Sequence, residues 1–337
     1  MKVISDYELI DKKCWNDFVF KHPSGNIFQT PGFYQVYQNT KYYEPLVLGV
    51  YSNTNKILGI LVSVVQKESN GIIGFFSARS IIFGGPLVYN SDEEVLDLLL
   101  SSYKKIINKK AIYTQVRNCT ILDEDNKNIF AKNGFVFKDH LNILIDLKFS
   151  LDTLWKGIKR NRKDGINKAS KQGFLFEACN HLNDISTFYY LLTETYKNIR
   201  LPCPDISFFE QINNHLTDYC KWFILYHNDI PKIILCALVY KKNLYAFSIG
   251  ISQEDTFKKL RPVDLFYWEI IKWAVNKRLK YFDWMGAGHP QKEYGVRKFK
   301  LQYGGRTLNP GRYEIIHKNE LYKIGKLGLG LWQNIQK

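Results

Sequence analysis

The residues best suited to chemistry lie near the C-terminus, in the segment YGVRKFKLQYGG at positions 294–305. If this segment is helical, Val296, Phe299 and Tyr303 share one face. Lys300 then lies at the edge of that apolar stripe, where its ammonium loses part of its hydration. Such an ammonium can hold a phosphate or stabilise a developing oxyanion more strongly than an exposed one. The periodicity leaves open the alternative that Lys300 only extends along the apolar surface to reach water.

A second candidate is Asp283, which ends an expected strand just upstream and precedes the loop WMGAGHP. Two glycines in that loop let the backbone approach a ligand closely. Asp283 suits two roles, a general base for an amine or a cap for backbone N–H groups of the loop. The pair Gly286-x-Gly288 lacks the third glycine and the following helix of a dinucleotide fingerprint, which disfavours NAD.

A third candidate is the basic stretch at 151–173, which the pattern predicts to be one helix that Gly173 ends. Its basic residues are Lys156, Lys159, Arg160, Arg162, Lys163, Lys168 and Lys171. Because charge runs usually face water, the stretch is either a solvated helix or a phosphate-binding element. The whole chain carries a net charge of +15. That charge attracts nucleic acid, nucleotide-sugar diphosphates or an acidic membrane face without choosing among them.

The scaffold for these residues reads as two copies of one α/β unit, and a length of 337 residues also favours two domains. Strands at 45–51 and 57–65, joined by a polar turn, have counterparts at 222–226 and 233–240. An apolar segment at 72–76 is expected to extend the first set of strands. The two copies are offset by roughly 170 to 175 residues. We predict domains at 1–148 and 149–316, with a basic helix at 151–172 and an active-site segment at 283–305 in the second.

Three segments together resemble a known family. The basic stretch reads W-x-x-x-x-x-x-R and then KASKQG, and it is followed downstream by FDWMG and by FKLQYGG. These segments are similar to those of the Fem-type (FemABX-related) aminoacyltransferases, which are tandem proteins of the GCN5-related N-acyltransferase (GNAT) fold. The resemblance implies transfer of an amino acid from aminoacyl-tRNA to an amino group of a peptidoglycan precursor, without a bound cofactor. It also implies that the segment 317–337 packs back on the first domain.

The resemblance implies a role for several residues. Phe299 and Lys300 match the family's active-site pair, in which the lysine stabilises negative charge, and Asp283 joins them as a catalytic candidate. The expected substrate-binding residues are Lys197, Arg200, Tyr294, Arg297 and Tyr303. The expected tRNA or phosphate contacts are Arg160, Arg162, Lys168 and Lys171.

The sequence departs from the family at two phosphate contacts. The N-terminal Q-x-x-x-W segment with its following basic residue reads QTPGF here and is followed by Tyr37. The T-x-R of the second domain reads Thr195-Tyr196-Lys197, which replaces a forked guanidinium by a point charge. The acceptor is therefore open between a UDP-muramyl peptide and another anionic, amino-bearing precursor of the cell envelope.

Two other classes of function compete with this interpretation. An acyl-CoA-dependent N-acyltransferase acting on an amino sugar needs a glycine-rich loop for the pyrophosphate of acetyl-CoA, and the stretch 253–262 contains no glycine. This favours aminoacyl-tRNA as donor. A non-catalytic RNA or membrane-surface binder would instead lose no more binding through Lys300→Ala than through Lys298→Ala, because counterion release counts charges.

The remaining composition bears on metal sites, redox state and cellular location. Six cysteines lie 16 or more residues apart and seven histidines are scattered, which indicates a reduced protein with no metal site. The longest apolar run is far short of the roughly 20 residues that span a bilayer, and the first residues lack the apolar core of a secretory signal. We therefore expect a cytoplasmic protein without a transmembrane segment, with a peripheral position at the inner membrane face left open.

Overall fold

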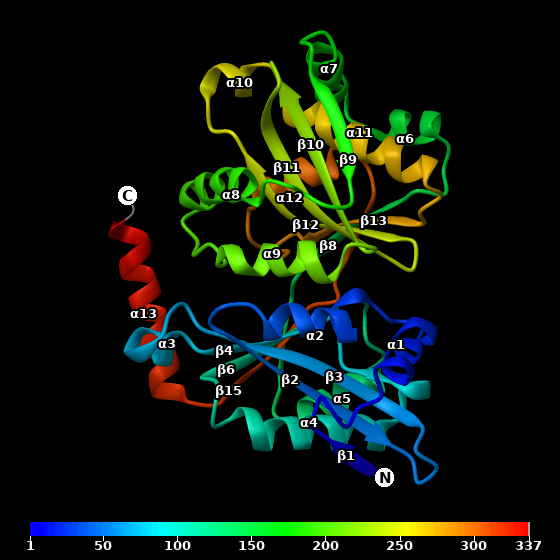
Figure 1. The fold of residues 1–337 in the computed structure, drawn as a ribbon, viewed down its shortest axis with the longest axis vertical. Helices are drawn as coiled ribbons and strands as arrows, with labels where there is room; N and C mark the ends of the chain where they lie inside the picture. Colours follow the sequence, from blue (N-terminus) through cyan, green and yellow to red (C-terminus); the bar gives the residue numbers. More distant parts are fainter. Residues whose placement is uncertain (336–337) are drawn as a thin grey trace. The chain divides into compact units, whose positions relative to one another are not determined.

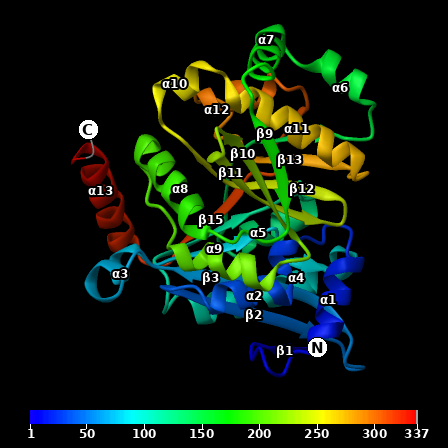
Figure 2. The ribbon, with the colours of Figure 1, turned by 45° about the horizontal axis from the view of Figure 1, so that its top comes forward.

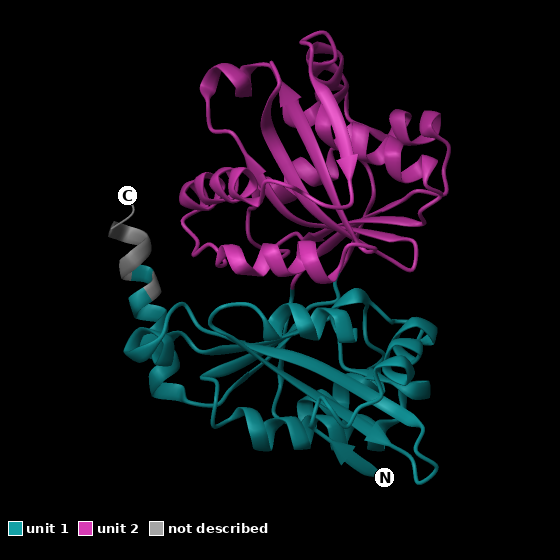
Figure 3. Cartoon of the chain, viewed as in Figure 1, with its two compact units in different colours: residues 1–139, 309–337 teal, residues 140–308 magenta. Residues whose placement is uncertain are grey.

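The computed structural model describes residues 1–335, with side chains up to Gly330 except that of Leu329. It divides into two units. Unit 1 comprises residues 1–139 together with the chain from 309 onward, and unit 2 comprises residues 140–308. Both units are layered α/β structures, each with its own sheet (Figure 1 and Figure 3).

The sheet of unit 1 runs in the order β1-β2-β3-β4-β6-β15-β7, and β5 pairs with β3 beside this path. Its strands are β1 (Lys2–Ile4), β2 (Tyr43–Tyr51), β3 (Ile57–Gln66), β4 (Arg79–Phe83), β5 (Leu87–Val88), β6 (Tyr113–Arg117), β7 (Val136–Lys138) and β15 (Arg312–Ile316). Its helices are α1 (Lys12–Lys21), α2 (Pro31–Gln38), α3 (Gly71–Ser77), α4 (Glu93–Ile107), α5 (Glu124–Lys132) and α13 (Asn319–Ile335), with short 3-10 turns at Ile27–Gln29 and Tyr89–Ser91.

The sheet of unit 2 runs in the order β14-β8-β13-β12-β11-β10-β9. Its strands are β8 (Asn142–Asp146), β9 (Leu175–Cys179), β10 (Cys220–His227), β11 (Ile230–Tyr240), β12 (Asn243–Ile251), β13 (Tyr281–Gly286) and β14 (Arg306–Leu308). Its helices are α6 (Leu151–Gly157), α7 (Arg160–Ala169), α8 (Ile185–Ile199), α9 (Ile206–His215), α10 (Asp255–Lys259), α11 (Pro262–Asn276) and α12 (Gly295–Leu301).

The two sheets repeat one topology. In each unit, antiparallel strands are followed by a crossover helix and a strand that joins in parallel, β4 with β6 in unit 1 and β12 with β13 in unit 2. The crossover helices are α4 and α11. Because a parallel pair needs such a crossover, the repeat of strand, helix and strand that the sequence shows produces the same sheet twice. The predicted fold class, two tandem GNAT-like units, is confirmed.

The unit boundaries differ from the predicted 148/149 and 316/317. Strand β8 belongs to unit 2, where it pairs with β13 and β14, and strand β15 belongs to unit 1, where it pairs with β6 and β7. Each unit therefore receives one strand that local sequence pattern assigns to the other. The chain after β15 continues in unit 1, where His317 and Lys318 donate their backbone N–H groups to Ile112. Residues 336–337 of the predicted C-terminal segment lie outside the described residues.

Two element predictions are wrong. The apolar segment at 72–76 is not a strand but the short helix α3, and β4 begins only at Arg79. The basic stretch at 151–172 is not one helix but two, because α6 ends at Gly157 and Ile158 takes an extended conformation with a buried side chain. The next residue, Lys159, donates its backbone N–H to Gln302 at 2.9 Å, which holds the break in place.

The core of unit 2 that matters for the site lies between the sheet and helices α7 and α11. Phe282 and Trp284 of β13 are buried in it. Because successive side chains of a strand alternate between faces, Asp283 points to the other face of the sheet. That face carries α8, since a side chain in place of Gly250 would meet Leu191 of α8 at 2.8 Å.

Candidate active site

The candidate site is built on an irregularity at the end of strand β13. The register with β8 shifts between Asp283 and Gly286, and Met285 between them has a left-handed φ of 58°. Bulges of this kind re-aim backbone and side-chain groups at the ends of strands. Here the carbonyl groups of Trp284 and Gly286 both accept hydrogen bonds from the ammonium of Lys300, at 2.6 Å and 2.8 Å.

Lys300 enters this site from helix α12 and keeps one donor for a ligand. An ammonium has three N–H donors, and the two carbonyls of β13 occupy two of them. In the part of the chain that the structure describes, the third has no partner. Burial lowers the pKa of Lys300 to about 8, against the opposing effect of the Asp283 carboxylate. The predicted partial desolvation of Lys300 is thus present, and the lysine does not simply extend into water.

Asp283 is almost completely buried and does two things at once. Its Oδ1 accepts the backbone N–H of Met285 at 2.7 Å, so it caps the irregular turn of β13. Burial raises the pKa of Asp283 to about 7, although the Met285 hydrogen bond and the Lys300 ammonium both act to lower it. A carboxyl group that titrates near neutrality can also exchange a proton with a reacting amine. Both roles left open by the sequence are therefore compatible with the geometry.

Phe299 does not face solvent but packs within a cluster of aromatic rings. Its ring lies 5.3 Å from that of Tyr303, 5.9 Å from that of Tyr267 and 6.2 Å from that of Trp284. These contacts fix the inner face of α12 against α11 and β13. Val296, predicted on the same face, is exposed instead, because α12 is only seven residues long and begins at Gly295.

A buried carboxylate, Asp264, ties the basic helix α7 to this cluster. Asp264 accepts from Arg162 at 2.7 Å, from Arg261 at 2.7 Å and from the hydroxyl of Tyr303 at 3.1 Å. The guanidinium of Arg162 also lies 4.6 Å from the centre of the Phe299 ring. Helix α7 can approach because a side chain at Gly165 would meet the Asp264 carboxylate at 2.0 Å.

Arg297 fastens the loop between β13 and α12. Its guanidinium donates to the carbonyls of Ala287 at 3.3 Å, His289 at 2.6 Å and Pro290 at 3.2 Å, and also to that of Lys292. This loop directly follows Gly286, whose carbonyl accepts a hydrogen bond from Lys300. Arg297, which was expected to bind substrate, therefore donates its hydrogen bonds to the chain's own backbone.

The other predicted substrate residues are more dispersed. The ring of Tyr294 packs close to Gly288, where an added side chain would meet it at 3.0 Å. Lys197 and Arg200 lie at the end of α8, where Lys197 pairs with Glu194 at 2.7 Å and Arg200 ends the helix in a left-handed conformation. Lys197 is 69% exposed.

The predicted phosphate contacts divide into two groups. Arg162 is largely buried and engaged with Asp264, which leaves it little freedom for a polyanion. Arg160, Lys168 and Lys171 are exposed on α7 and just after it, although the ammonium of Lys168 donates to the Lys259 carbonyl at 2.9 Å.

Two residues of the site escaped sequence analysis, Asp264 and Tyr267. Both lie on α11, which reads as an ordinary amphipathic helix after its Pro262 start. One signal was available, since a carboxylate in the first turn of a helix otherwise buried among apolar residues needs partners. The sequence does not say which arginines supply them.

Replacing Arg297 by alanine is expected to lower kcat of the reaction at this site about tenfold and to leave KM unchanged. The loop then loses four hydrogen bonds and no longer holds the Gly286 carbonyl in place for Lys300. Steady-state kinetics would show this split, with Lys298→Ala as the matched control because Lys298 pairs only with the exposed Glu293. A rise in KM at constant kcat would instead make Arg297 a direct substrate contact.

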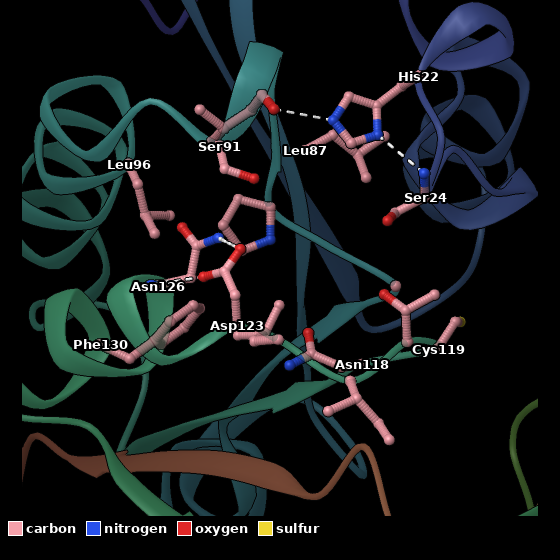
Figure 4. Close-up of a pocket in the computed structure, with 16 residues that line it drawn as sticks. His22, Ser24, Leu87, Ser91, Leu96, Asn118, Cys119, Asp123, Asn126 and Phe130 are labelled. Atoms are coloured by element: carbon pink, nitrogen blue, oxygen red, sulfur yellow. Dashed lines mark hydrogen bonds between the residues drawn. The ribbon is translucent and has the colours of Figure 1, made fainter. Parts of the chain in front are cut away.

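Unit 1 contains a separate small pocket of about 100 Å³ (Figure 4). It lies between the end of β6, the start of α5 and the chain just after α1, where His22 accepts the backbone N–H of Ser24 at 3.1 Å. The side-chain nitrogen of Asn118 is buried at its wall without a hydrogen-bond partner. The pocket contains none of the predicted site residues.

Two negative findings concern the described residues. No group of three or more histidine, cysteine, aspartate or glutamate side chains among them is placed to hold a metal ion. Within the same range, every helix is too short or too polar to cross a membrane.

Comparison with known protein families matches most of unit 2 to an acetyltransferase domain. Residues 156–295 match the model of the acetyltransferase (GNAT) domain family. The match begins in α6 and ends at the start of α12, so it covers Asp264 and Asp283 and stops short of Lys300. No curated protein sequence matches the chain.

Solved structures resemble the chain over nearly its whole length at low sequence identity. FemX has a TM-score of 0.71 at 17% identity, covering 96% of this chain and 99% of that one. A tandem GNAT protein from the clavulanic acid biosynthesis pathway has a TM-score of 0.60 at 8% identity, covering 94% and 98%. The C-terminal domain of a protein described as a lysylphosphatidylglycerol synthetase, from Agrobacterium fabrum, has a TM-score of 0.59 at 13% identity, covering 94% of both chains. By the domain that it matches, the chain is an acyltransferase, and over its whole length it has the tandem GNAT fold of these structures.

Proposed function

We propose that the chain transfers an amino acid from aminoacyl-tRNA to an amino group of an anionic precursor of the cell envelope. The observation that carries this proposal is Lys300, a half-desolvated ammonium held by two carbonyls of β13 with one donor left over. A fixed positive donor of this kind suits a reaction in which negative charge develops on an oxygen.

The reaction forms one bond and breaks one. The acceptor amine attacks the carbonyl carbon of the aminoacyl ester, and the third N–H of Lys300 donates to the oxyanion that results. Collapse of this intermediate forms the amide and breaks the ester bond, and the departing 3′-oxygen of the tRNA takes up a proton. Asp283 accepts the proton that the amine loses and is the source of the proton that the 3′-oxygen takes up. No covalent enzyme intermediate is needed.

The start of helix α11 supports aminoacyl-tRNA over a CoA thioester. A helix N-terminus binds the pyrophosphate of a nucleotide through free backbone N–H groups. In α11, Pro262 has no N–H, and the Asp264 carboxylate already occupies the first turn together with two arginines. The Asp264 carboxylate therefore already occupies the place that a pyrophosphate would take at the start of α11.

The fold neighbours support an envelope acceptor. One of them is described as a synthetase of lysylphosphatidylglycerol, which is an aminoacylated lipid. In this chain, Lys197 and Arg200 of α8 are cations for the anionic part of the acceptor, and Arg160, Lys168 and Lys171 are cations for the tRNA backbone. Peptidoglycan precursors have the required combination of phosphate and free amine.

The alternative is an acyl-CoA-dependent N-acyltransferase, which the match to an acetyltransferase domain favours. Thermal unfolding of the purified protein with and without acetyl-CoA separates the two. A ligand at 100 times its dissociation constant stabilises the fold by about 2.7 kcal/mol. We expect no shift with acetyl-CoA and transfer of labelled amino acid from charged tRNA to an amino-bearing envelope precursor. A shift that free CoA competes away would favour the alternative.

The pH dependence of kcat/KM is expected to show a narrow maximum. Activity rises with pH as Asp283, whose pKa is about 7, loses its proton and becomes able to accept one. It falls again as Lys300, whose pKa is about 8, loses the proton that it donates to the oxyanion. In Asp283→Asn the acid limb is expected to disappear. If the limb stays, the proton acceptor is a group other than Asp283.

A further inference from the structure

Unit 1 carries an exposed apolar helix, α3, that has no part in the proposed function. Helix α3 reads GIIGFFS and contains no charged residue. Three of its apolar side chains are exposed, Ile72 by 77%, Ile73 by 68% and Phe75 by 51%. Single exposed apolar residues are common on protein surfaces, but three within one short helix form a patch that indicates an interaction site.

Helix α13 lies beside α3 and extends this patch (Figure 1 and Figure 2). An added side chain at Gly325 would lie 3.2 Å from the carbonyl of Phe76, so glycine brings the two helices together. On the part of α13 whose side chains are described, Ile324 and Leu327 are more than half exposed. We call the set Ile72, Ile73, Phe75, Ile324 and Leu327 the α3–α13 patch.

Lysines surround the α3–α13 patch. The ammonium of Lys318 lies 5.3 Å from the centre of the Phe75 ring, and that of Lys326 lies 4.8 Å from the Tyr322 ring. Lys323 adds a third cation, and it pairs with Glu320, the single acidic residue at 317–328. The surroundings of the patch therefore carry net positive charge.

We propose that the α3–α13 patch docks unit 1 on the surface of an anionic lipid bilayer. Apolar side chains at the tip of a surface helix enter the boundary between headgroups and acyl chains, and flanking lysines reach the lipid phosphates. Juxtaposed basic residues add attraction to an anionic leaflet. This inference is independent of the proposed reaction.

The charge of the patch argues against protein occupants. Protein interfaces are depleted in lysine, whereas three lysines border this patch. Two copies of the chain that met through the patch in a symmetric dimer would bring their lysines together, which costs electrostatic energy. A bilayer rich in phosphate satisfies both the apolar side chains and the cations.

The test is co-sedimentation of the full chain with vesicles of phosphatidylcholine, with and without phosphatidylglycerol. We expect binding to the anionic vesicles only, and a loss of at least about tenfold in Ile72→Ser/Ile73→Ser, because burial of two isoleucine side chains in the bilayer is then lost. Lys318→Ala/Lys326→Ala is expected to weaken binding and to reduce its dependence on salt. The control is Leu175→Ser/Ile230→Ser, which removes two apolar residues of unit 2 that are also more than half exposed and should change nothing.

Three results would overturn the proposal. One is equal binding by the chain and by Ile72→Ser/Ile73→Ser. Another is an equal loss in the unit 2 control, which would show that general surface hydrophobicity is responsible. The third is a dimer in size-exclusion chromatography that Ile72→Ser/Ile73→Ser converts to a monomer without any vesicle binding, which would make the patch a contact between copies. Transfer activity does not enter any of these readouts.

Discussion

Lys300→Met is expected to lower kcat for aminoacyl transfer by about 100- to 1,000-fold, the usual loss when one donor to an oxyanion is removed. Methionine keeps much of the length and apolar surface of the lysine side chain, so the packing of α12 is preserved. What disappears is the charged donor that the carbonyls of Trp284 and Gly286 hold in place. Single-turnover transfer from charged tRNA measures this loss directly.

The matched control is Lys298→Met, two residues away on the same helix. Lys298 is 65% exposed and pairs with Glu293, so its removal should leave kcat within a factor of about two. The comparison also addresses the possibility of a non-catalytic RNA or membrane binder. Binding through counterion release counts charges, so such a protein would lose affinity equally in both variants. Equal small effects in the two variants would exclude the proposed mechanism.

Much of the fold was predictable because its signals are local. The hairpin β2–β3 is two apolar runs around a polar turn, and the same pattern recurs in β10–β11. Lys300 was predictable for the same reason, since its position at the edge of an apolar stripe and the motif around it both lie within a few residues. The burial of Lys300 confirms that part of the prediction, and its catalytic role stays a prediction.

What escaped prediction depends on contacts between distant residues. Strand β8 belongs to unit 2 because it pairs with β13, about 140 residues further along the chain. The break between α6 and α7 is held by a hydrogen bond from Lys159 to Gln302. Arg162 was expected to contact the tRNA together with the other basic residues of its stretch, and only the fold shows that Asp264 engages it. Spacing along a sequence carries no information on such pairs.

The prediction of a strand at 72–76 was wrong for another reason. Its composition suits a strand, and a strand would have been buried in the sheet of unit 1. The structure instead forms α3, which begins at Gly71 in a left-handed conformation with φ of 68°. A sequence of this composition that stays exposed departs from the usual burial of apolar residues, and that departure is what makes the α3–α13 patch a candidate for docking.

Asp264→Ala is expected to destabilise unit 2 by about 2–4 kcal/mol. Removing one member of a buried ion pair leaves its partner charge uncompensated, which costs about 3–5 kcal/mol in fully buried sites. The expected value is lower here because the side chains of Arg162 and Arg261 are 18% and 39% exposed and keep part of their hydration. Urea unfolding of the variant and the parent chain measures the difference.

Asp264→Ala should disturb the active site as well as lower the stability of unit 2. Asp264 holds the Tyr303 hydroxyl and the Arg162 guanidinium. The ring of Tyr303 and the guanidinium of Arg162 both pack against Phe299, the neighbour of Lys300. A matched surface control is Glu194→Ala, which removes an exposed pair with Lys197 and should cost less than about 1 kcal/mol.

A double-mutant cycle with Arg162→Met isolates the ion pair. If Arg162 and Asp264 act as one unit, the double variant should be more stable than the sum of the single losses implies, by about 1–3 kcal/mol. Simple additivity would mean that the two residues stabilise unit 2 separately. In that case Arg162 would return to the set of cations available to a polyanionic donor.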